Sequence, residues 1–82
     1  MSKIKKLIEK LLSGKSDNNF DFDDLRMIIL YFGFGEEIKS SHHIYRIKGH
    51  NAFLNIQPLA GNKSKPYQVK QVRKTITRYF IK

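Results

Sequence analysis

The most restrictive feature of the sequence is a change in the spacing of its apolar residues at Gly33. Before this glycine, apolar side chains recur every three or four residues, as in amphipathic helices. After it come three short segments rich in aromatic and β-branched residues, at 34–39, 42–48 and 52–57, which are typical of strands. Because short turns separate these segments, we expect an antiparallel meander after two helices, and therefore an α+β fold.

The first predicted helix ends at Ser13 and Gly14, because a glycine at this point supplies a helix C-terminus. Its apolar stripe consists of Ile4, Leu7, Ile8, Leu11 and Leu12. The lysines of this helix would also suit a membrane-surface anchor. A short stripe of this kind more often packs on its own domain, and we favour packing.

The second helix is expected to begin near Phe22, with Asp21 as its N-cap, and to end at Gly33. Its apolar residues occupy more than one side, which indicates that the helix is covered from several directions. The additional apolar residues are Met27, Leu30 and Tyr31. We expect the first helix to cover them.

A loop over 58–65 is expected to lead to a last helix, which starts at Pro66 and runs to about Phe80. One side of this helix is apolar and consists of Val69, Val72, Ile76, Tyr79 and Phe80. The roughly opposite side is basic and consists of Lys70, Arg73, Lys74 and Arg78. We expect this basic face to be free for a ligand.

The chain has 82 residues, and we expect 1–82 to form one domain with a core at 20–80 and a helical extension at 1–14. It has no cysteine, which excludes disulfides and thiolate metal sites and suits a reducing cytoplasm. The longest apolar run, 27–32, is far shorter than the roughly 20 residues of a membrane-spanning helix. No signal-peptide cleavage site follows the first helix. We expect a cytoplasmic protein without a membrane partner.

The charge of the chain is distributed unevenly. Residues 42–82 contain nine basic residues and no acidic one, whereas 21–41 contain two basic and five acidic residues. A long segment without a carboxylate attracts polyanions, and a basic patch is the usual electrostatic signature of a nucleic-acid-binding protein. The sequence therefore predicts nucleic acid as a partner.

His42, His43 and His50 are the residues best suited to proton transfer. A zinc site needs three or four converging ligands, and neighbours on a strand point to opposite faces, so we expect no metal. For the same reason only one of His42 and His43 can face a substrate. A hydrogen-bonded structural histidine is the simplest alternative for each of them.

RNA would give one histidine a chemical role, because RNA carries its own nucleophile, the 2′-hydroxyl. A protein that cleaves it needs proton transfer, which one imidazole can supply near neutral pH, and stabilisation of charge on one phosphate. Nearby Lys and Arg side chains would supply that stabilisation. No catalytic triad, glycine-rich phosphate loop or paired-carboxylate motif points to a different chemistry.

Five separated motifs of the chain agree in order and spacing with one known family. They are Asp21–Arg26 (DFDDLR), Gly33-Phe34, Ser41–Tyr45 (SHHIY), Asn55–Pro58 (NIQP) and Lys65–Arg73 (KPYQVKQVR). With them, the chain resembles the HicA family of bacterial toxins over most of residues 20–74. The N-terminal helix resembles an extension carried by part of that family.

The resemblance implies a double-stranded-RNA-binding-like fold, with an extra N-terminal helix, used as a metal-independent endoribonuclease. Such a toxin degrades mRNA without a cofactor or small-molecule ligand and is neutralised by a cognate HicB-type antitoxin. The family's catalytic histidine corresponds to His42. The family usually has Gly-Ser-His where this chain has Ser40-Ser41-His42, so a turn that needs a positive φ would be strained at Ser40.

These inferences define a candidate site with His42 as the residue that transfers protons. The residues expected to contact RNA are Ser41, Arg46, Lys63, Lys65, Lys70, Arg73 and Lys74. The main alternative is a non-catalytic RNA- or DNA-binding module, because charge and fold would explain it without a role for His42. Another is a protein that only docks an acidic protein partner.

Overall fold

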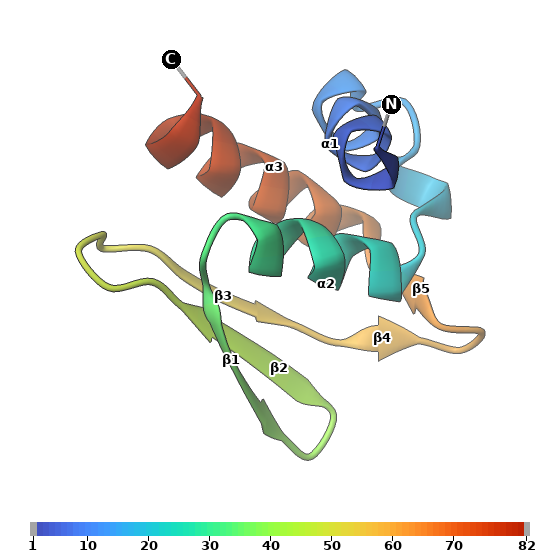
Figure 1. Cartoon of the computed structure of the whole chain (residues 1–82). Coiled ribbons are helices and arrows are strands. Elements are labelled where there is room, and N and C mark those ends of the chain that lie inside the picture. Colours follow the sequence, from blue (N-terminus) through green and yellow to red (C-terminus); the bar gives the residue numbers. More distant parts are fainter. Residues whose placement is uncertain (1, 82) are drawn as a thin grey trace.

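Two helices, a three-stranded antiparallel sheet and a C-terminal helix form the protein, so the predicted α+β class is confirmed (Figure 1). The computed structural model describes residues 2–81. Its helices are α1 (Lys3–Ser13), the 3-10 turn η1 (Asp17–Asn19), α2 (Phe22–Tyr31) and α3 (Pro66–Phe80). Its strands are β1 (Gly35–Lys39), β2 (His42–Arg46), β3 (Phe53–Ile56), β4 (Pro58–Leu59) and β5 (Lys63–Ser64).

The sheet has the order β1-β2-β3, and helices α2 and α3 lie over one of its faces (Figure 1). Helix α1 packs on α2 and α3 from the side away from the sheet. Among residues 2–81, no element covers the other face of the sheet. This is the arrangement of the double-stranded-RNA-binding-like fold, with α1 added to it.

Strand register decides which side chains face the helices. His43 pairs with Ile56 and Tyr45 pairs with Leu54, and Tyr45, Leu54 and Ile56 are buried in the core. Because successive side chains alternate between the two faces, their neighbours point away from the helices. This outward surface, here called the open face, includes Glu37, His42, Ile44, Arg46, Phe53 and Asn55.

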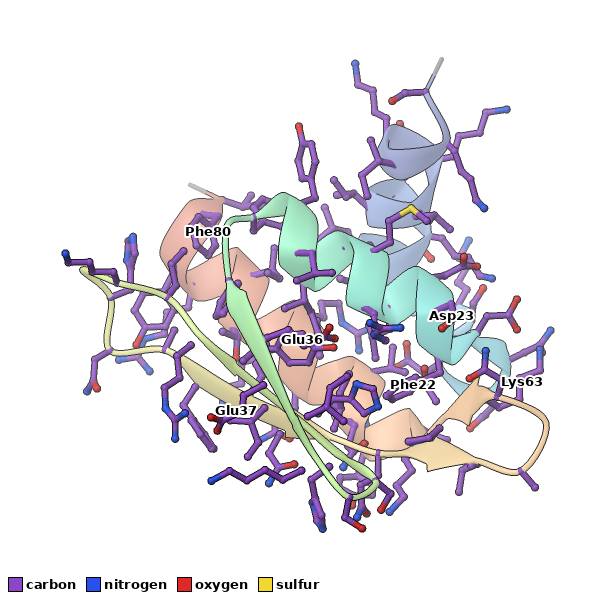
Figure 2. All side chains as sticks on the ribbon, turned by 60° about the horizontal axis from the view of Figure 1, so that its bottom comes forward. Phe22, Asp23, Glu36, Glu37, Lys63 and Phe80 are labelled. Carbon is purple, nitrogen blue, oxygen red and sulfur yellow. The ribbon has the colours of Figure 1, made fainter. Side chains whose placement is uncertain are left out.

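The observed strands are shorter than the predicted ones, and the segment predicted as a loop at 58–65 contains the small hairpin β4-β5. This hairpin satisfies backbone groups beside the buried Phe20. The Phe20 carbonyl accepts a hydrogen bond from the Ser64 amide at 2.8 Å, and the Asn62 carbonyl accepts one from the Phe22 amide at 2.9 Å. The hairpin therefore anchors the start of α2, where Lys63 also lies (Figure 2).

Asp21 occupies the N-cap position of α2 as predicted, although its side chain makes no capping hydrogen bond. Its Oδ1 atom instead accepts a hydrogen bond from the Lys63 ammonium at 2.6 Å. Both partners in this hydrogen bond are ionised, whereas a backbone amide is neutral, so the ammonium adds a Coulomb attraction that a capping contact lacks.

Helix α1 ends at Gly14 as predicted, with φ of 72°, and buries Leu7 and Leu11. The expectation that it covers the extra apolar face of α2 is wrong. The residues of that face, Met27, Leu30 and Tyr31, remain between 39% and 61% exposed. Helix α1 packs on both α2 and α3 and buries Leu7 and Leu11 between them, so it leaves much of the outer side of α2 uncovered.

A polar cluster joins α2 to the sheet at the inner side of β1. The Arg26 guanidinium donates two hydrogen bonds to the Glu36 carboxylate, at 2.8 and 2.9 Å, and the Tyr45 hydroxyl donates a third at 2.5 Å. Glu36 points toward the helices, whereas Glu37 points to the opposite side of the strand (Figure 2). The hydrogen bonds from Arg26, and then from Tyr45, lower the pKa of Glu36 from 4.5 to about 2. Burial is the main cause that raises the pKa of Tyr45.

We predict that Glu36→Gln weakens the dependence of stability on acid. A carboxyl whose pKa is lowered in the folded state stabilises the protein above its ordinary pKa of 4.5, and this contribution disappears as pH falls toward 2. Urea unfolding at about pH 6 and about pH 2 should show the wild type losing up to about 3 kcal/mol more than the variant. Equal losses would contradict a stabilising role for the ionised carboxylate.

The turn between β1 and β2 has two loop residues, Ser40 and Ser41, since Lys39 pairs with His42. Ser40 has φ of 57°, and Ser41 has no positive φ. A positive φ at only the first loop residue is the requirement of a type II′ hairpin turn, in which glycine is preferred. Serine at this position strains the turn that delivers Ser41 and His42 to the sheet.

We predict that Ser40→Gly stabilises the protein by about 1 kcal/mol, because relief of a strained positive φ exceeds the entropy that glycine adds to the unfolded chain. For a domain of this size, the melting temperature should rise by about 4–8 °C. Ser41→Gly is the matched control and should lower it. An unchanged or lower melting temperature for Ser40→Gly would show that the turn is not strained.

Candidate active site and nucleic-acid interface

His42 is the first residue of β2 and is exposed on the open face, at the end of the sheet nearest the start of α3. Both of its ring nitrogens have polar neighbours on β3 or just after it. Nδ1 lies 3.2 Å from Oδ1 of Asn55, and Nε2 lies 2.9 Å from Nε2 of Gln57. The ring is therefore held in one orientation by side chains of the adjacent strand.

Lys65 determines how these hydrogen bonds are directed. Its ammonium, which can only donate, bonds to Oε1 of Gln57 at 2.8 Å, so the amide nitrogen of Gln57 faces His42. That nitrogen donates to Nε2 of the imidazole, and the ring proton must then be on Nδ1, which donates to Asn55. This connected set, here called the His42 relay, consists of Lys65, Gln57, His42 and Asn55.

The His42 relay borders a small polar pocket of about 290 Å³. The pocket is lined by His42, Asn55, Gln57, Tyr67, Gln68 and Gln71. Gln68 connects its two sides, because its Oε1 accepts a hydrogen bond from the backbone N–H of Gln57 at 3.0 Å. The lining has hydrogen-bond donors and acceptors but no carboxylate, so it suits an anionic or polar ligand.

His43 lies on the other face of the strand, as alternation requires. Its ring packs edge-on against Phe22 with centroids 4.9 Å apart, and its Nδ1 lies 3.5 Å from the Glu36 carboxylate. His50 is exposed in the loop before β3 and packs beside the rings of Tyr79 and Phe80. Of the three histidines, only His42 borders the polar pocket.

The basic face of α3 is only partly free. Lys70, Lys74 and Arg78 are exposed and border a shallow hollow on this helix. Arg73, between them, instead donates two hydrogen bonds to the Asp17 carboxylate at 2.8 and 3.0 Å, and one to the Leu11 carbonyl at 3.1 Å. The hydrogen bond from Arg73 lowers the pKa of Asp17. The expectation of an entirely free face is therefore wrong at Arg73, which fastens α1 and η1 to α3.

The other predicted RNA contacts are dispersed. Lys63 is occupied at the start of α2, where it bonds to Asp21 and, at 2.9 Å, to Asn19, and its hydrogen bond lowers the pKa of Asp21. Ser41 lies within the site, and its Oγ accepts a hydrogen bond from Gln57 at 3.4 Å. Arg46 is exposed at the other end of β2, over the ring of Phe53. The structure thus brings Ser41, His42 and Lys65 together and places Lys63, Arg46 and Arg73 elsewhere.

Sequence reasoning assigned no role to five residues that line this pocket. They are Asn55, Gln57, Tyr67, Gln68 and Gln71. A signal was present for two of them, because Asn55 and Gln57 alternate with the apolar Leu54 and Ile56 and so had to share the face opposite the core. The contribution of α3 had no such signal, since it depends on how the helix packs against β3.

Among residues 2–81, no three His, Cys, Asp or Glu side chains converge in a way that could hold a metal ion. Within the same residues, no helix has the length and apolar character needed to cross a membrane.

Comparison with known proteins found no matching family model, no matching curated protein and no matching solved structure. The resemblance to HicA toxins therefore stays a prediction from sequence motifs. The structure establishes the class: an α+β protein of double-stranded-RNA-binding-like arrangement, with a histidine held in a polar pocket at one end of its sheet.

We predict that Lys65→Met redistributes the proton of His42. Without the ammonium, the Gln57 amide can turn its oxygen toward the ring, which favours the tautomer with the proton on Nε2. Nitrogen NMR of the neutral imidazole should show the Nδ1–H form in the wild type and a mixture in the variant. Lys63→Met, which removes an ammonium outside the His42 relay, should leave the wild-type tautomer. The same tautomer in both variants would show that Lys65 does not direct it.

Proposed function

We propose that the protein is a cytoplasmic, metal-independent endoribonuclease that acts on mRNA, with His42 transferring protons. The observation that carries this proposal is the His42 relay, which holds one exposed imidazole in a fixed orientation and tautomer within a polar pocket. A structural histidine would be expected to serve the core, as His43 does beside Phe22. His42 has no comparable packing role.

The proposed reaction uses the 2′-hydroxyl of RNA as the nucleophile. The 2′-oxygen bonds to the adjacent phosphorus, the bond from phosphorus to the 5′-oxygen breaks, and one proton moves from the first oxygen to the second. His42 takes the proton at Nε2 or returns it to the leaving oxygen. Because Gln57 occupies the Nε2 lone pair, its amide must be displaced when RNA enters.

Positive charge near the pocket would stabilise the phosphate during this reaction. Lys65 lies within the site, and Lys70 follows on the exposed side of α3, with Lys74 one turn beyond it. Since residues 42–82 contain no acidic side chain, no side chain of this segment opposes phosphate binding. Preorganised charge of this kind is usually a large part of enzymatic rate enhancement.

The proposed biological role is that of a toxin in a type II toxin–antitoxin system, in keeping with the motif resemblance. The partner would be a HicB-type antitoxin with an acidic surface, which could dock on the same lysines and exclude RNA. The rival function is a non-catalytic RNA- or DNA-binding module, for which the exposed lysines of α3 alone would suffice. Cleavage of purified RNA in the presence of EDTA separates these two functions.

We predict that His42→Ala reduces RNA cleavage by at least about 100-fold, because a positioned general acid or base typically contributes 10²–10⁴-fold. RNA affinity should change little, since the lysines remain. The assay is cleavage of a labelled RNA in EDTA, with binding measured in parallel. His50→Ala, which removes an exposed histidine outside the pocket, is the control and should cleave like the wild type. Full activity of His42→Ala would exclude His42 from the mechanism.

A further inference from the structure

The open face carries a second feature that proton transfer does not use, the side chain of Phe53. This residue begins β3, an edge strand of the sheet, and remains 53% exposed although it lies in a strand. A single exposed apolar side chain is ordinary in a folded protein. The surroundings of Phe53 are what distinguish it.

Arg46 is the direct cross-strand partner of Phe53, and its guanidinium carbon lies 5.2 Å from the centre of the Phe53 ring. Aromatic rings and guanidinium planes are the two surfaces on which proteins stack unpaired bases. The carboxylate nearest to this pair is Glu37, 3.8 Å from Arg46 on the β1 side. A polyanion would therefore approach Phe53 from the side of the pair away from β1, over the edge of β3 that α3 flanks.

That side is hollowed and basic. A pocket of about 150 Å³ runs between the start of β3 and α3, and Phe53, Lys74 and Arg78 are among its lining residues. Lys74 and Arg78 also border the hollow on the exposed side of α3. A base on Phe53 would thus have cations beside it that can hold the adjoining phosphates.

Phe53 is also in line with the proposed active site. It lies two residues from Asn55 on the same face of β3, which is about 7 Å along a strand, and Asn55 is bonded to His42. A strand of RNA that stacks a base on Phe53 can therefore continue along β3 to the His42 relay. Only an unpaired base is free to do so, because a base inside a helix is covered by its neighbours on both faces.

We infer that the edge between β3 and α3 is a binding groove for single-stranded RNA, in which an unpaired base stacks on Phe53 beside Arg46. This inference rests on the proposed function and names its substrate class. Lys74 and Arg78 hold the backbone next to the stacked base, and Asn55 leads the strand to His42. The groove selects unpaired RNA over a duplex although the fold resembles that of duplex-binding domains.

The experiment measures binding of a 2′-O-methyl single-stranded oligonucleotide, which cannot be cleaved because its 2′-oxygen is blocked. Phe53→Leu, which keeps an apolar side chain but loses the aromatic face, should weaken binding by at least about fivefold, since a stacked base is worth roughly five- to 150-fold in affinity. Phe53→Trp should retain binding. Tyr31→Leu, at an aromatic residue of α2 that is similarly exposed, is the matched control and should bind like the wild type.

Salt dependence distinguishes stacking from charge. Lys74→Gln should flatten the slope of log K against log salt by about 0.7, the contribution of one phosphate of a single strand. Phe53→Leu should leave this slope unchanged while it lowers affinity. Thermal unfolding of each variant shows whether it is folded. The affinity of Phe53→Trp is a second test at the same position, because this variant keeps an aromatic ring.

Four results would overturn the inference. Three of them leave the proposed function standing, and the fourth removes it as well. Equal affinities for wild type and Phe53→Leu, or loss of binding in Phe53→Trp, would exclude stacking while RNA binding stands. Tighter binding of the wild type to a duplex of the same sequence would exclude an unpaired substrate. Failure of the wild type to bind either RNA would remove the proposed function together with the groove.

Discussion

The hydrogen-bonded cluster of Arg26, Glu36 and Tyr45 is the interaction on which the orientation of the sheet depends. A carboxylate under the helices is tolerated only with strong partners, and Arg26 and Tyr45 donate three hydrogen bonds to it. The cluster therefore keeps Glu36 and Tyr45 on the inner side of β1 and β2. Because side chains alternate along a strand, His43 then faces inward and His42 outward. A partly buried interaction between α2 and the sheet thus acts with the apolar core to place His42 on the solvent side.

Two groups of basic residues have different roles in the structure. Arg26, Lys63 and Arg73 each bond to a carboxylate of another segment and hold elements together. Lys70, Lys74 and Arg78 line the exposed hollow on α3, and Lys65 bonds to the neutral Gln57. The acidic residues that neutralise Lys63 and Arg73 lie at or near η1 and the start of α2. This arrangement leaves Lys70, Lys74 and Arg78 as positive charges along α3, beside the edge of the sheet, without an ion pair to a carboxylate of residues 2–81.

The corner that delivers His42 to the sheet combines strain with a fixed hydrogen-bond network. Ser40 has the positive φ that a type II′ turn requires, and the residues after it enter the His42 relay. Strained backbone is retained where the surrounding structure over-determines it, and here the paired strands and the relay do so. A small loss of stability at Ser40 therefore accompanies a defined position for His42. The proposed groove along β3 extends from this corner to Phe53.

The sequence by itself determined the order of the three α-helices and of strands β1, β2 and β3, the end of α1 at Gly14 and the opposite facing of His42 and His43. These features follow from local periodicity, turn residues and the alternation of a strand. Motif resemblance, and not spacing, selected His42. Tertiary structure decided that Arg73 and Lys63 are occupied, that Met27, Leu30 and Tyr31 stay exposed, and that Gln57 and Lys65 orient the imidazole. Each of these features depends on contacts between residues far apart in the chain. The local pattern cannot predict such contacts, because it gives the spacing of residues along one helix or strand and does not give the element that packs against it.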